Sequence, residues 1–259
     1  MQIAMTLYIG CAEWPSWEDN IARLRADGWT IQTQVQQLPE SARAGDIVLP
    51  MSLRDMRAWA SHASAFCPPA GLVELLDDKY AFVLWMLRSG FAAHVPTLFS
   101  AHIGGVCHQH SPATARHIVK KVRCSGAEGS YISSPSPSSN SIPHIDGDSV
   151  TQRYIHGLVE YGSHFCVKNG TVVHSVCFAM PCGPDHISRG RMTGHAKVSQ
   201  PCPALFSRLF KCLNYHGFAC INFKMENGVP MIFEINPRLG GTVVHDMHEF
   251  QNMIHALLK

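Results

Sequence analysis

The stretch Met231–Thr242, "MIFEINPRLGGT", places an acid and an amide within an apolar run near the end of the chain. The run predicts a buried strand, in which Glu234 and Asn236 stand at alternate positions. Because successive side chains of a strand point to opposite faces, these two share one face. A buried carboxylate is costly unless it is paired or bound to a cation. The strand therefore predicts a site that holds a charged partner.

The preceding segment supplies a third oxygen donor. Residues 218–237, "FACINFKMENGVPMIFEINP", predict a hairpin whose turn is "ENG" and whose first strand carries Asn222. Oxygen atoms on neighbouring strands suit Mg²⁺. Arg238 adds a cation with a fork geometry that matches phosphate or carboxylate, and Gly240 and Gly241 let backbone approach an anion closely. The alternative is a polar strand end with a surface salt bridge.

Upstream lysines point to phosphate. Residues 117–130, "HIVKKVRCSGAEGS", predict a strand ending at Lys120 and Lys121, followed by a loop of small residues. Loop amides can cradle phosphates while a lysine neutralises them. Lys79 adds a cation ahead of a predicted helix, with a solvated helix face as the alternative.

An extended segment, residues 152–162, follows with "QRYIHGLVEYG". Its backbone can pair with an adenine edge, and Glu160 can accept hydrogen bonds from ribose hydroxyls. The alternative for Glu160 is an exposed strand carboxylate.

The composition of the 259 residues indicates a globular protein with a substantial core, since 46% are hydrophobic and 15% charged. A net charge of +2 gives no support for a nucleic-acid surface. No apolar stretch reaches the roughly 18 residues of a membrane span. The first residues predict a strand and lack the basic region of a signal peptide, so a cytoplasmic location is expected.

Cysteine and histidine spacing argues against disulfide frameworks and zinc sites. The ten cysteines contain no C-x-x-C pair and are expected to be buried free thiols. "CHQH" at 107–110 and the pair His245 and His248 offer metal ligands but lack a second pair at zinc spacing. These histidines are therefore expected to be ordinary surface or core residues and not metal ligands. No G-x-S-x-G is present, so a serine nucleophile is not expected.

The first seventy residues alternate between strand and helix patterns. Their order predicts a small parallel sheet with crossover helices, without a dinucleotide fingerprint. Strands are predicted at 5–10, 30–35 and 42–50, with a short fourth at 65–69, and helices at 16–28 and 52–62.

The remaining chain predicts mixed helices and antiparallel strands. One helix is expected over 72–90, a strand in 94–100, a strand–loop–strand unit in 115–132, and a surface loop at 133–149. Segment 150–157 is expected to lie antiparallel with a hairpin at 159–180. A helix at 203–217, closed by Gly217, precedes the last hairpin, and a helical tail follows it.

The order and spacing of these motifs resemble the ATP-grasp superfamily, in the branch of carbamoyl-phosphate synthetase and biotin carboxylase. The resemblance runs from about Leu72 to Thr242 and is carried by "LLDDKYAFVLWMLRSGFAAHVPT", "IVKKVRCSGAEGSYI", "TQRYIHGLVEY" and "GFACINFKMENGVPMIFEINPRLGGT". It implies an α+β / α/β chain with an ATP-grasp fold of two α+β lobes, preceded by a small parallel-sheet, Rossmann-like domain. The implied domains are 1–71 and 72–259, the latter with a small lobe at about 93–155 and a large lobe at about 156–259.

The resemblance also implies residue roles at the nucleotide. Lys79 and Lys120 match the lysines that contact the phosphates, and Lys120 also lies near adenine. Tyr154 and Ile155 match the hinge whose backbone meets adenine, and Glu160 resembles the ribose-binding acid. The mobile loop that closes over the triphosphate matches Ser125 to Gly129, with Ser125, Gly126 and Gly129 as its binding residues.

At the reacting end, Asn222, Glu234 and Asn236 match the positions that hold Mg²⁺. Arg238 matches the arginine that faces the transferred phosphate or the substrate carboxylate, and with Lys120 it is assigned to catalysis.

The chain departs from the family pattern at several positions. Arg153 stands where many members have Glu, and Lys121 where a proline is frequent. Glu160 is one residue further from Gly157 than in the commonest spacing. Asn222 replaces an acid found in many members, and "SSPSPSSNS" takes the place of a helix found in longer members.

The implied activity is ATP- and Mg²⁺-dependent ligation, in which a carboxylate becomes an acyl phosphate and is joined to an amine. One or two Mg²⁺ ions are expected, with Mn²⁺ as a substitute. Nucleotide binding without turnover and phosphotransfer by an ATP-grasp kinase stay open as alternatives. The expected partners are small carboxylates and amines, amino-acid or peptide-like, with no nucleic acid and no membrane. A homodimer stays open, as do Arg189, Arg191 and Lys197 as substrate contacts.

Overall fold

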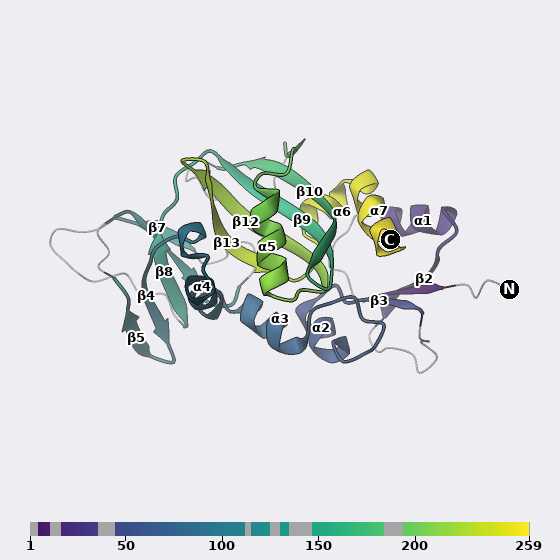
Figure 1. The fold of residues 1–259 in the computed structure, drawn as a ribbon, viewed down its shortest axis with the longest axis horizontal. Coiled ribbons are helices and arrows are strands. Elements are labelled where there is room, and N and C mark those ends of the chain that lie inside the picture. Colours follow the sequence, from purple (N-terminus) through teal and green to yellow (C-terminus); the bar gives the residue numbers. More distant parts are fainter. Residues whose placement is uncertain are drawn as a thin grey trace.

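Sheets of three, five and five strands organise the described part of the computed structural model. The structure describes residues 5–10, 17–35, 45–111, 115–124, 130–134, 147–183 and 194–258, without the side chains of Trp17 and Gln34. The sheets follow one another along the long axis of the molecule, and the sheet of the longest strands lies between the other two (Figure 1).

The N-terminal sheet is parallel, as predicted. Its strands are β1 (Thr6–Gly10), β2 (Thr30–Val35) and β3 (Ile47–Leu49) in the order β2-β1-β3, with crossover helices α1 (Trp17–Ala26) and α2 (Leu53–Trp59). The fourth strand expected at 65–69 is reduced to one parallel bridge between Val48 and Ala65. Two prolines follow that bridge and cannot donate to a ladder.

The single helix expected over 72–90 is wrong, because the segment forms two helices. They are α3 (Ala70–Asp77) and α4 (Lys79–Arg88), separated by Asp78 in an extended conformation. The Asp78 carboxylate accepts a hydrogen bond from the Ala81 N–H at 2.9 Å and so caps α4. An aspartate at this position satisfies an amide that the helix itself leaves unpaired.

The next five strands form an antiparallel sheet in the order β5-β4-β8-β6-β7. The short helix η1 (Ala92–His94) leads into it. The strands are β4 (Leu98–Ile103), β5 (Val106–Gln109), β6 (His117–Lys121), β7 (Tyr131–Ser133) and β8 (Ser149–Arg153). The expected pairing of segment 150–157 with the hairpin at 159–180 is wrong, because β8 inserts between β4 and β6. The exposed strand β5 was not predicted because it lacks an apolar face.

The long strands form a second antiparallel sheet in the order β11-β10-β9-β12-β13. The strands are β9 (Val159–Lys168), β10 (Thr171–Pro181), β11 (Ala196–Val198), β12 (Gly217–Glu226) and β13 (Val229–Asn236). Both predicted hairpins are confirmed, with Asn-Gly turns at 169–170 and 227–228 in which both residues have positive φ. The short edge strand β11 was not predicted.

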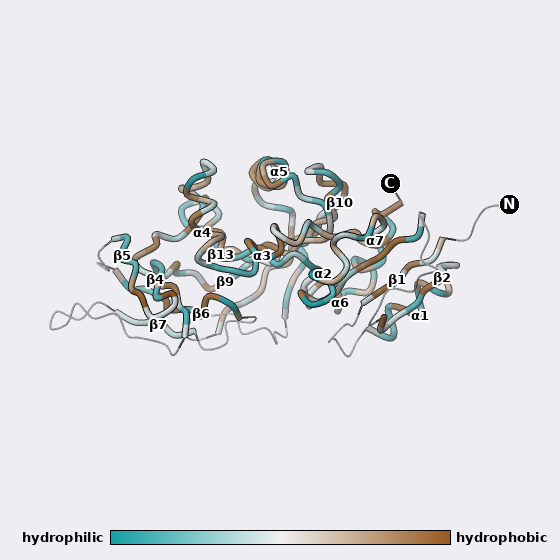
Figure 2. Tube along the Cα trace, turned by 90° about the horizontal axis from the view of Figure 1, so that it is seen from below, coloured by the Kyte–Doolittle hydropathy of each residue, from teal (hydrophilic) through white to brown (hydrophobic). Residues whose placement is uncertain are grey.

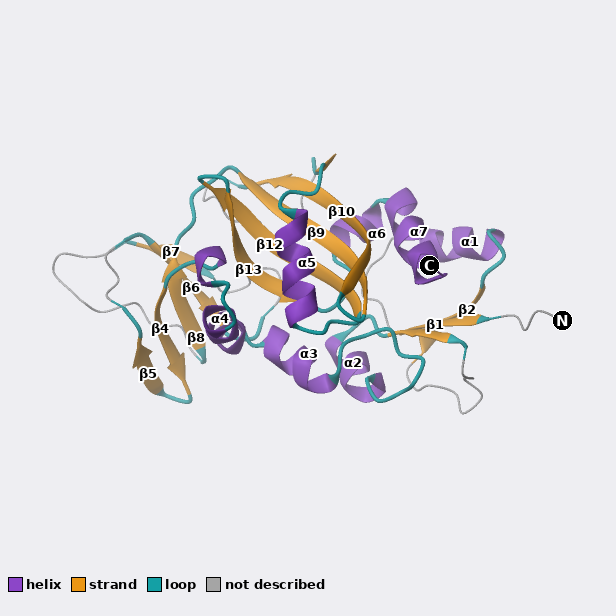
Figure 3. Ribbon diagram, viewed as in Figure 1, coloured by secondary structure: helices purple, strands orange, loops and turns teal. Residues whose placement is uncertain are grey.

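One face of this long-stranded sheet is covered by α5 (Pro203–Cys212), which crosses the strands in Figure 3 and carries brown, hydrophobic turns in Figure 2. Phe206 and Phe210 of α5 pack on Phe165 of β9, with ring centroids 5.4 and 4.9 Å apart. The helix ends before Gly217, which instead starts β12 with a φ of +134°. A Cβ at Gly217 would lie 2.9 Å from the Cys67 Cα, so this contact requires glycine.

The two ends of the chain share one core. Asp246 splits the expected helical tail into α6 (Gly241–His245) and α7 (Met247–His255), and η2 (Ala256–Leu258) follows. These helices lie beside α1 (Figure 1), and Asn20 Nδ2 donates to the Val244 carbonyl at 2.7 Å. Their buried side chains join those of the N-terminal sheet, among them Leu7, Ile9, Leu24, Val243, Phe250 and Met253. The boundary at 71/72 stays a prediction.

The described cysteines are free thiols, as expected, but their burial differs. Cys67, Cys166, Cys177 and Cys220 are buried, whereas Cys107 and Cys212 are exposed. No helix in the described ranges has both the length and the apolar character needed to cross a bilayer.

The break at Asp78 gives a stability prediction. Asp78→Ala removes the cap of α4 and should lower the free energy of unfolding by about 1 kcal/mol. Asp78→Asn retains a capping oxygen and should lose much less. Urea denaturation of both variants measures the difference; equal losses would show that the negative charge matters and the cap does not.

Candidate functional site

The face of the long-stranded sheet opposite α5 carries the polar residues. In β12, Ile221 and Phe223 belong to the core under α5, so Asn222 between them points to the other face. In β13, Ile235 joins the same core, which leaves Glu234 and Asn236 facing the same way as Asn222. Strand alternation thus builds a polar floor on one side of a sheet whose other side is apolar.

Hydrogen bonds join these side chains into a row that crosses three strands. Asn236 Nδ2 donates to Glu234 Oε1 at 3.0 Å and to Asn222 Oδ1 at 3.3 Å. Asn222 Nδ2 donates to Glu160 Oε1 on β9 at 3.2 Å. Lys79 Nζ lies 3.5 Å from Glu234 Oε2 and extends the row to the start of α4. The structure therefore brings together residues that are far apart in the sequence.

A second buried lysine, Lys120 of β6, faces this row. Lys120 Nζ lies 5.6 Å from the centre of the Phe233 ring, and burial together with the charge of Lys79 lowers the pKa of Lys120 to about 8. Burial and Glu234 raise the pKa of Glu160 to about 7, while Lys224 opposes that rise. Opposing charges packed at low exposure are a feature of functional sites.

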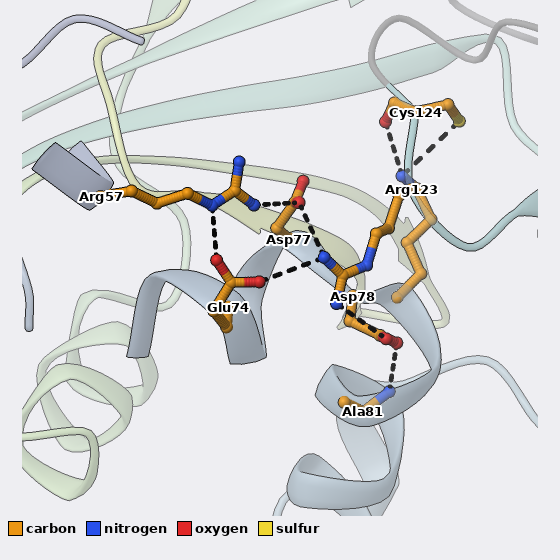
Figure 4. Close-up of polar contacts among 8 residues, drawn as sticks. Arg57, Glu74, Asp77, Asp78, Ala81, Arg123 and Cys124 are labelled. Atoms are coloured by element: carbon orange, nitrogen blue, oxygen red, sulfur yellow. Dashed lines mark hydrogen bonds and ion pairs between the residues drawn. The ribbon is translucent and has the colours of Figure 1, made fainter. Parts of the chain in front are cut away.

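The predicted phosphate loop, with Ser125, Gly126 and Gly129, lies outside the described residues. Its root is described at Cys124, whose carbonyl accepts a hydrogen bond from Lys79 Nζ at 2.7 Å. The preceding residue, Arg123, bridges Glu74 and Asp78 at 3.1 and 3.7 Å, and Arg57 of α2 reaches the same acidic cluster (Figure 4). This ion-pair network links the loop root to α2, α3 and α4.

The predicted hinge residues Tyr154 and Ile155 are both buried between the two antiparallel sheets. The Tyr154 N–H is already used, because it donates to the Arg116 carbonyl at 2.9 Å. The Ile155 N–H donates to no other residue among those described. Of the two hinge amides, Ile155 is therefore the one available to a ligand.

Two further residues at the hinge were missed from the sequence. Gln152 is fully buried; its Nε2 donates to the Pro96 carbonyl at 3.4 Å, while its Oε1 has no partner within the described residues. The pairing of Gln152 with Ile118 puts it on the same sheet face as Lys120. Lys224 is 3% exposed and donates to the carbonyls of the hinge. Its alternation with Asn222 in "NFK" was the signal that would have found it.

Arg238 lies beyond Asn236, next to a buried histidine. His164 Nδ1 accepts from the Gly240 N–H at 3.3 Å, so the proton sits on Nε2, which lies 2.6 Å from Thr242 Oγ1 and donates to it. A Cβ on Gly240 would lie 2.6 Å from His164 Cε1, so the loop that carries Arg238 needs glycine there for packing. Burial and then Arg238 lower the pKa of His164 to about 3.

The donor set suits a hard cation. Asn222 Oδ1 and Glu234 Oε1 both accept from Asn236 Nδ2, so these two oxygens lie on either side of the Asn236 amide nitrogen. Across the described ranges, no group of three or more His, Cys, Asp or Glu side chains is arranged to hold a metal. A cation here would thus rely on amide oxygens beside Glu234, a chemistry that fits Mg²⁺ better than zinc.

Comparison with known proteins agrees with this geometry. A family model described as "ATP-grasp domain" matches residues 76–242. The chain belongs to the ATP-grasp family. A search of curated proteins found no match.

Solved structures confirm the ATP-grasp fold. N5-carboxyaminoimidazole synthetase from Staphylococcus aureus, complexed with ADP, is similar with a TM-score of 0.66 and 12% identity over 99% of this chain and 78% of that one. D-alanine–D-alanine ligase from Bacillus anthracis has a TM-score of 0.62 and 13% identity, covering 98% of each chain. The L-amino acid ligase from Bacillus licheniformis has a TM-score of 0.58 and 13% identity. The match covers 93% of this chain and 68% of that one.

The buried histidine of this ATP-grasp chain predicts an acid-dependent loss of stability. Because its folded pKa of about 3 lies below the unfolded value near 6.5, the unfolded state binds a proton that the folded state excludes. Stability is therefore full above about pH 6.5 and falls as the pH drops towards the folded pKa.

His164→Gln should flatten this slope by about 1.4 kcal/mol per pH unit between about pH 5.5 and 4. Urea denaturation at several pH values measures the slope. His108→Gln, a change of an exposed histidine, serves as the matched control. An unchanged slope in His164→Gln would show that His164 is not the group responsible.

Proposed function

We propose that this chain is an ATP- and Mg²⁺-dependent ligase that activates a carboxylate as an acyl phosphate and joins it to an amine. The observation that carries the proposal is the row from Lys79 through Glu234, Asn236 and Asn222 to Glu160, faced by Lys120. Membership of the ATP-grasp family supports ATP as the nucleotide.

The nucleotide would lie between the two antiparallel sheets. Lys79 and Lys120 supply positive charge for the phosphates, together with the loop that contains Ser125, Gly126 and Gly129. At the base end, the Ile155 N–H donor and the Gln152 Oε1 acceptor have no partner among the described residues and complement the Watson–Crick edge of adenine. Glu160 would accept from the ribose hydroxyls.

Asn222, Glu234 and Asn236 would hold Mg²⁺, or Mn²⁺ in its place. When bound, the ion supplies positive charge that offsets the phosphate oxygens. Lys79 has a second role besides binding phosphate. Its ammonium contacts the Glu234 carboxylate and also donates to the Cys124 carbonyl at the root of the proposed phosphate loop.

The reaction that fits this arrangement has two displacements. The substrate carboxylate attacks the γ-phosphorus of ATP and ADP leaves, giving an acyl phosphate. The amine then attacks the acyl carbon, inorganic phosphate leaves and the nitrogen loses a proton. The protein contributes positioning and charge, with Arg238 holding the substrate carboxylate or transferred phosphate and Lys120 stabilising the developing negative charge.

Small carboxylates and amines, amino-acid or peptide-like, are the proposed substrates. Two of the similar structures are named as ligases of D-alanine and of L-amino acids, which supports this class. We also propose that the protein is cytoplasmic and acts without nucleic acid or membrane. Its near-neutral net charge is consistent with this. Arg189 and Arg191, which were considered as substrate contacts, lie outside the described residues, and Lys197 instead pairs with Glu249.

Asn222 favours a competing function, nucleotide binding without turnover. It presents an amide where many family members have an acid, so the proposed cation site carries less negative charge. ADP release measured across pools of carboxylates and amines separates the two functions. Tight ATP binding with no ADP release from any pair would favour the competitor.

Substitution of Glu234 tests the proposed cation site. Glu234→Ala should lower the rate of ADP release by about 100-fold or more, by analogy with other losses of transition-state charge stabilisation. Its thermal unfolding curve should show that the fold survives. Glu18→Ala, a change of an exposed acid on α1, is the control and should keep full activity. Unchanged product formation in Glu234→Ala would contradict the assignment.

Hydroxylamine trapping tests the intermediate. Incubation with ATP, Mg²⁺, a carboxylate substrate and hydroxylamine should yield a hydroxamate, because hydroxylamine attacks an acyl phosphate. Mass spectrometry identifies the product. A phosphorylated alcohol formed without any hydroxamate would instead assign the chain to phosphotransfer.

A further inference from the structure

The hinge segment, residues 153–157, is held by side chains from one strand of the large lobe. Lys224 and Glu226 stand at alternate positions of β12 and both reach the hinge. The hinge connects β8 of one sheet to β9 of the other, so contacts made here set how the two sheets meet.

Lys224 supplies the first anchor. Its Nζ donates to the Ile155 carbonyl at 3.4 Å and to the Gly157 carbonyl at 3.1 Å, and the residue is 3% exposed. Burying an ammonium is costly, and hydrogen bonds to carbonyl oxygens offset part of that cost. The same ammonium lies 5.6 Å from the centre of the Tyr154 ring, and Arg116 lies 5.0 Å from that ring. Tyr154 thus packs with two cations.

Glu226 supplies the second anchor through Arg153. The guanidinium of Arg153 donates to both carboxylate oxygens of Glu226, at 2.7 and 2.6 Å. A two-point pair of this kind fixes orientation as well as distance. The pair therefore ties the first residue of the hinge, Arg153, to β12.

These anchors fix the peptides on both sides of the Ile155 amide, which has no acceptor among the described residues. The Tyr154 N–H donates to the Arg116 carbonyl, which holds the peptide between residues 153 and 154. The Ile155 carbonyl accepts from Lys224, which holds the peptide between residues 155 and 156. The Ile155 N–H belongs to the peptide between them. Because each peptide unit is planar, fixing its two neighbours limits where that N–H can point.

We infer that Lys224 is a positioning residue for nucleotide binding, which aims the Ile155 N–H at the nucleobase, and that the Arg153–Glu226 pair is its second support. The inference rests on the proposed function, since it assigns the nucleobase end of the same site. Lys224 and Glu226 act here through the hinge backbone.

The test compares Lys224→Met with a matched control, Lys168→Met. Lys168 also donates its ammonium to a backbone carbonyl, that of Leu257 at 2.8 Å, but lies at the other end of β9. The full-length variants are titrated with ATP and with ADP in the presence of Mg²⁺ by calorimetry, and their melting temperatures are recorded.

Lys224→Met should weaken both nucleotides by the same factor, about tenfold or more, because the base is common to both. Lys168→Met should bind both as the wild type does, and Lys224→Arg should retain most of the affinity. The Arg153→Glu and Glu226→Arg single variants should lose affinity and their combination should regain it. If Lys224→Met fails to fold, the regained nucleotide affinity of the Arg153→Glu, Glu226→Arg double variant still tests whether the hinge supports position the nucleobase donor.

Wild-type affinity in a folded Lys224→Met, an equal loss in Lys168→Met, or single Arg153→Glu and Glu226→Arg variants that bind normally would overturn the inference. A loss confined to ATP would overturn it too, since that would place the effect at the phosphates. A wild-type chain that binds neither nucleotide would overturn the proposed function, and this inference with it.

Discussion

Lys79 at the start of α4 and Glu234 of β13 form an ion pair, with 3.5 Å between Nζ and Oε2. The lysine side chain is 8% exposed, so its charge needs a partner, and loss of Glu234 would leave a buried ammonium. Asp78 sets the first residue of α4 and thereby places Lys79. The backbone N–H of Lys79 also donates to the Val122 carbonyl at 3.1 Å, two residues before Cys124 at the root of the predicted phosphate loop. One ion pair therefore ties α4, the loop root and β13 to the same point.

The polar row can exist because the opposite face of its sheet is so thoroughly apolar. α5 packs Phe206, Leu209 and Phe210 against β9 and β12, which stabilises the strands without using the face that carries Asn222 and Glu234. At the far end, α6 and α7 join the core of the N-terminal sheet. Hydrophobic burial is concentrated away from the row, and the side chains of the row are placed by strand geometry and by hydrogen bonds to one another.

Patterns of short range were predictable from the sequence. The alternation of Glu234 and Asn236 and the "ENG" and "KNG" turns depend on neighbouring residues, and they are confirmed. The parallel N-terminal sheet is also confirmed, because the order of strand and helix patterns was enough to predict it. The wrong predictions concern features that are determined by contacts between residues far apart in the sequence. A continuous helical pattern hid the break at Asp78, whose cap becomes visible only in the fold, and β8 pairs with β4 and β6 although β9 is its neighbour in sequence. Lys224 was overlooked because a lysine in a strand usually faces solvent, whereas here the hinge carbonyls cover it.

Asn222 occupies the centre of the row and uses both ends of its amide. Its Nδ2 donates to Glu160 and its Oδ1 accepts from Asn236. A carboxylate at this position has no proton to donate, so it would face Glu160 as a like charge, with Glu234 as a third acid on the adjacent strand. The amide removes that repulsion and still offers an oxygen to a cation. The acid at 160 and the amide at 222 are therefore one electrostatic arrangement, because Asn222 supplies the N–H that the Glu160 carboxylate accepts.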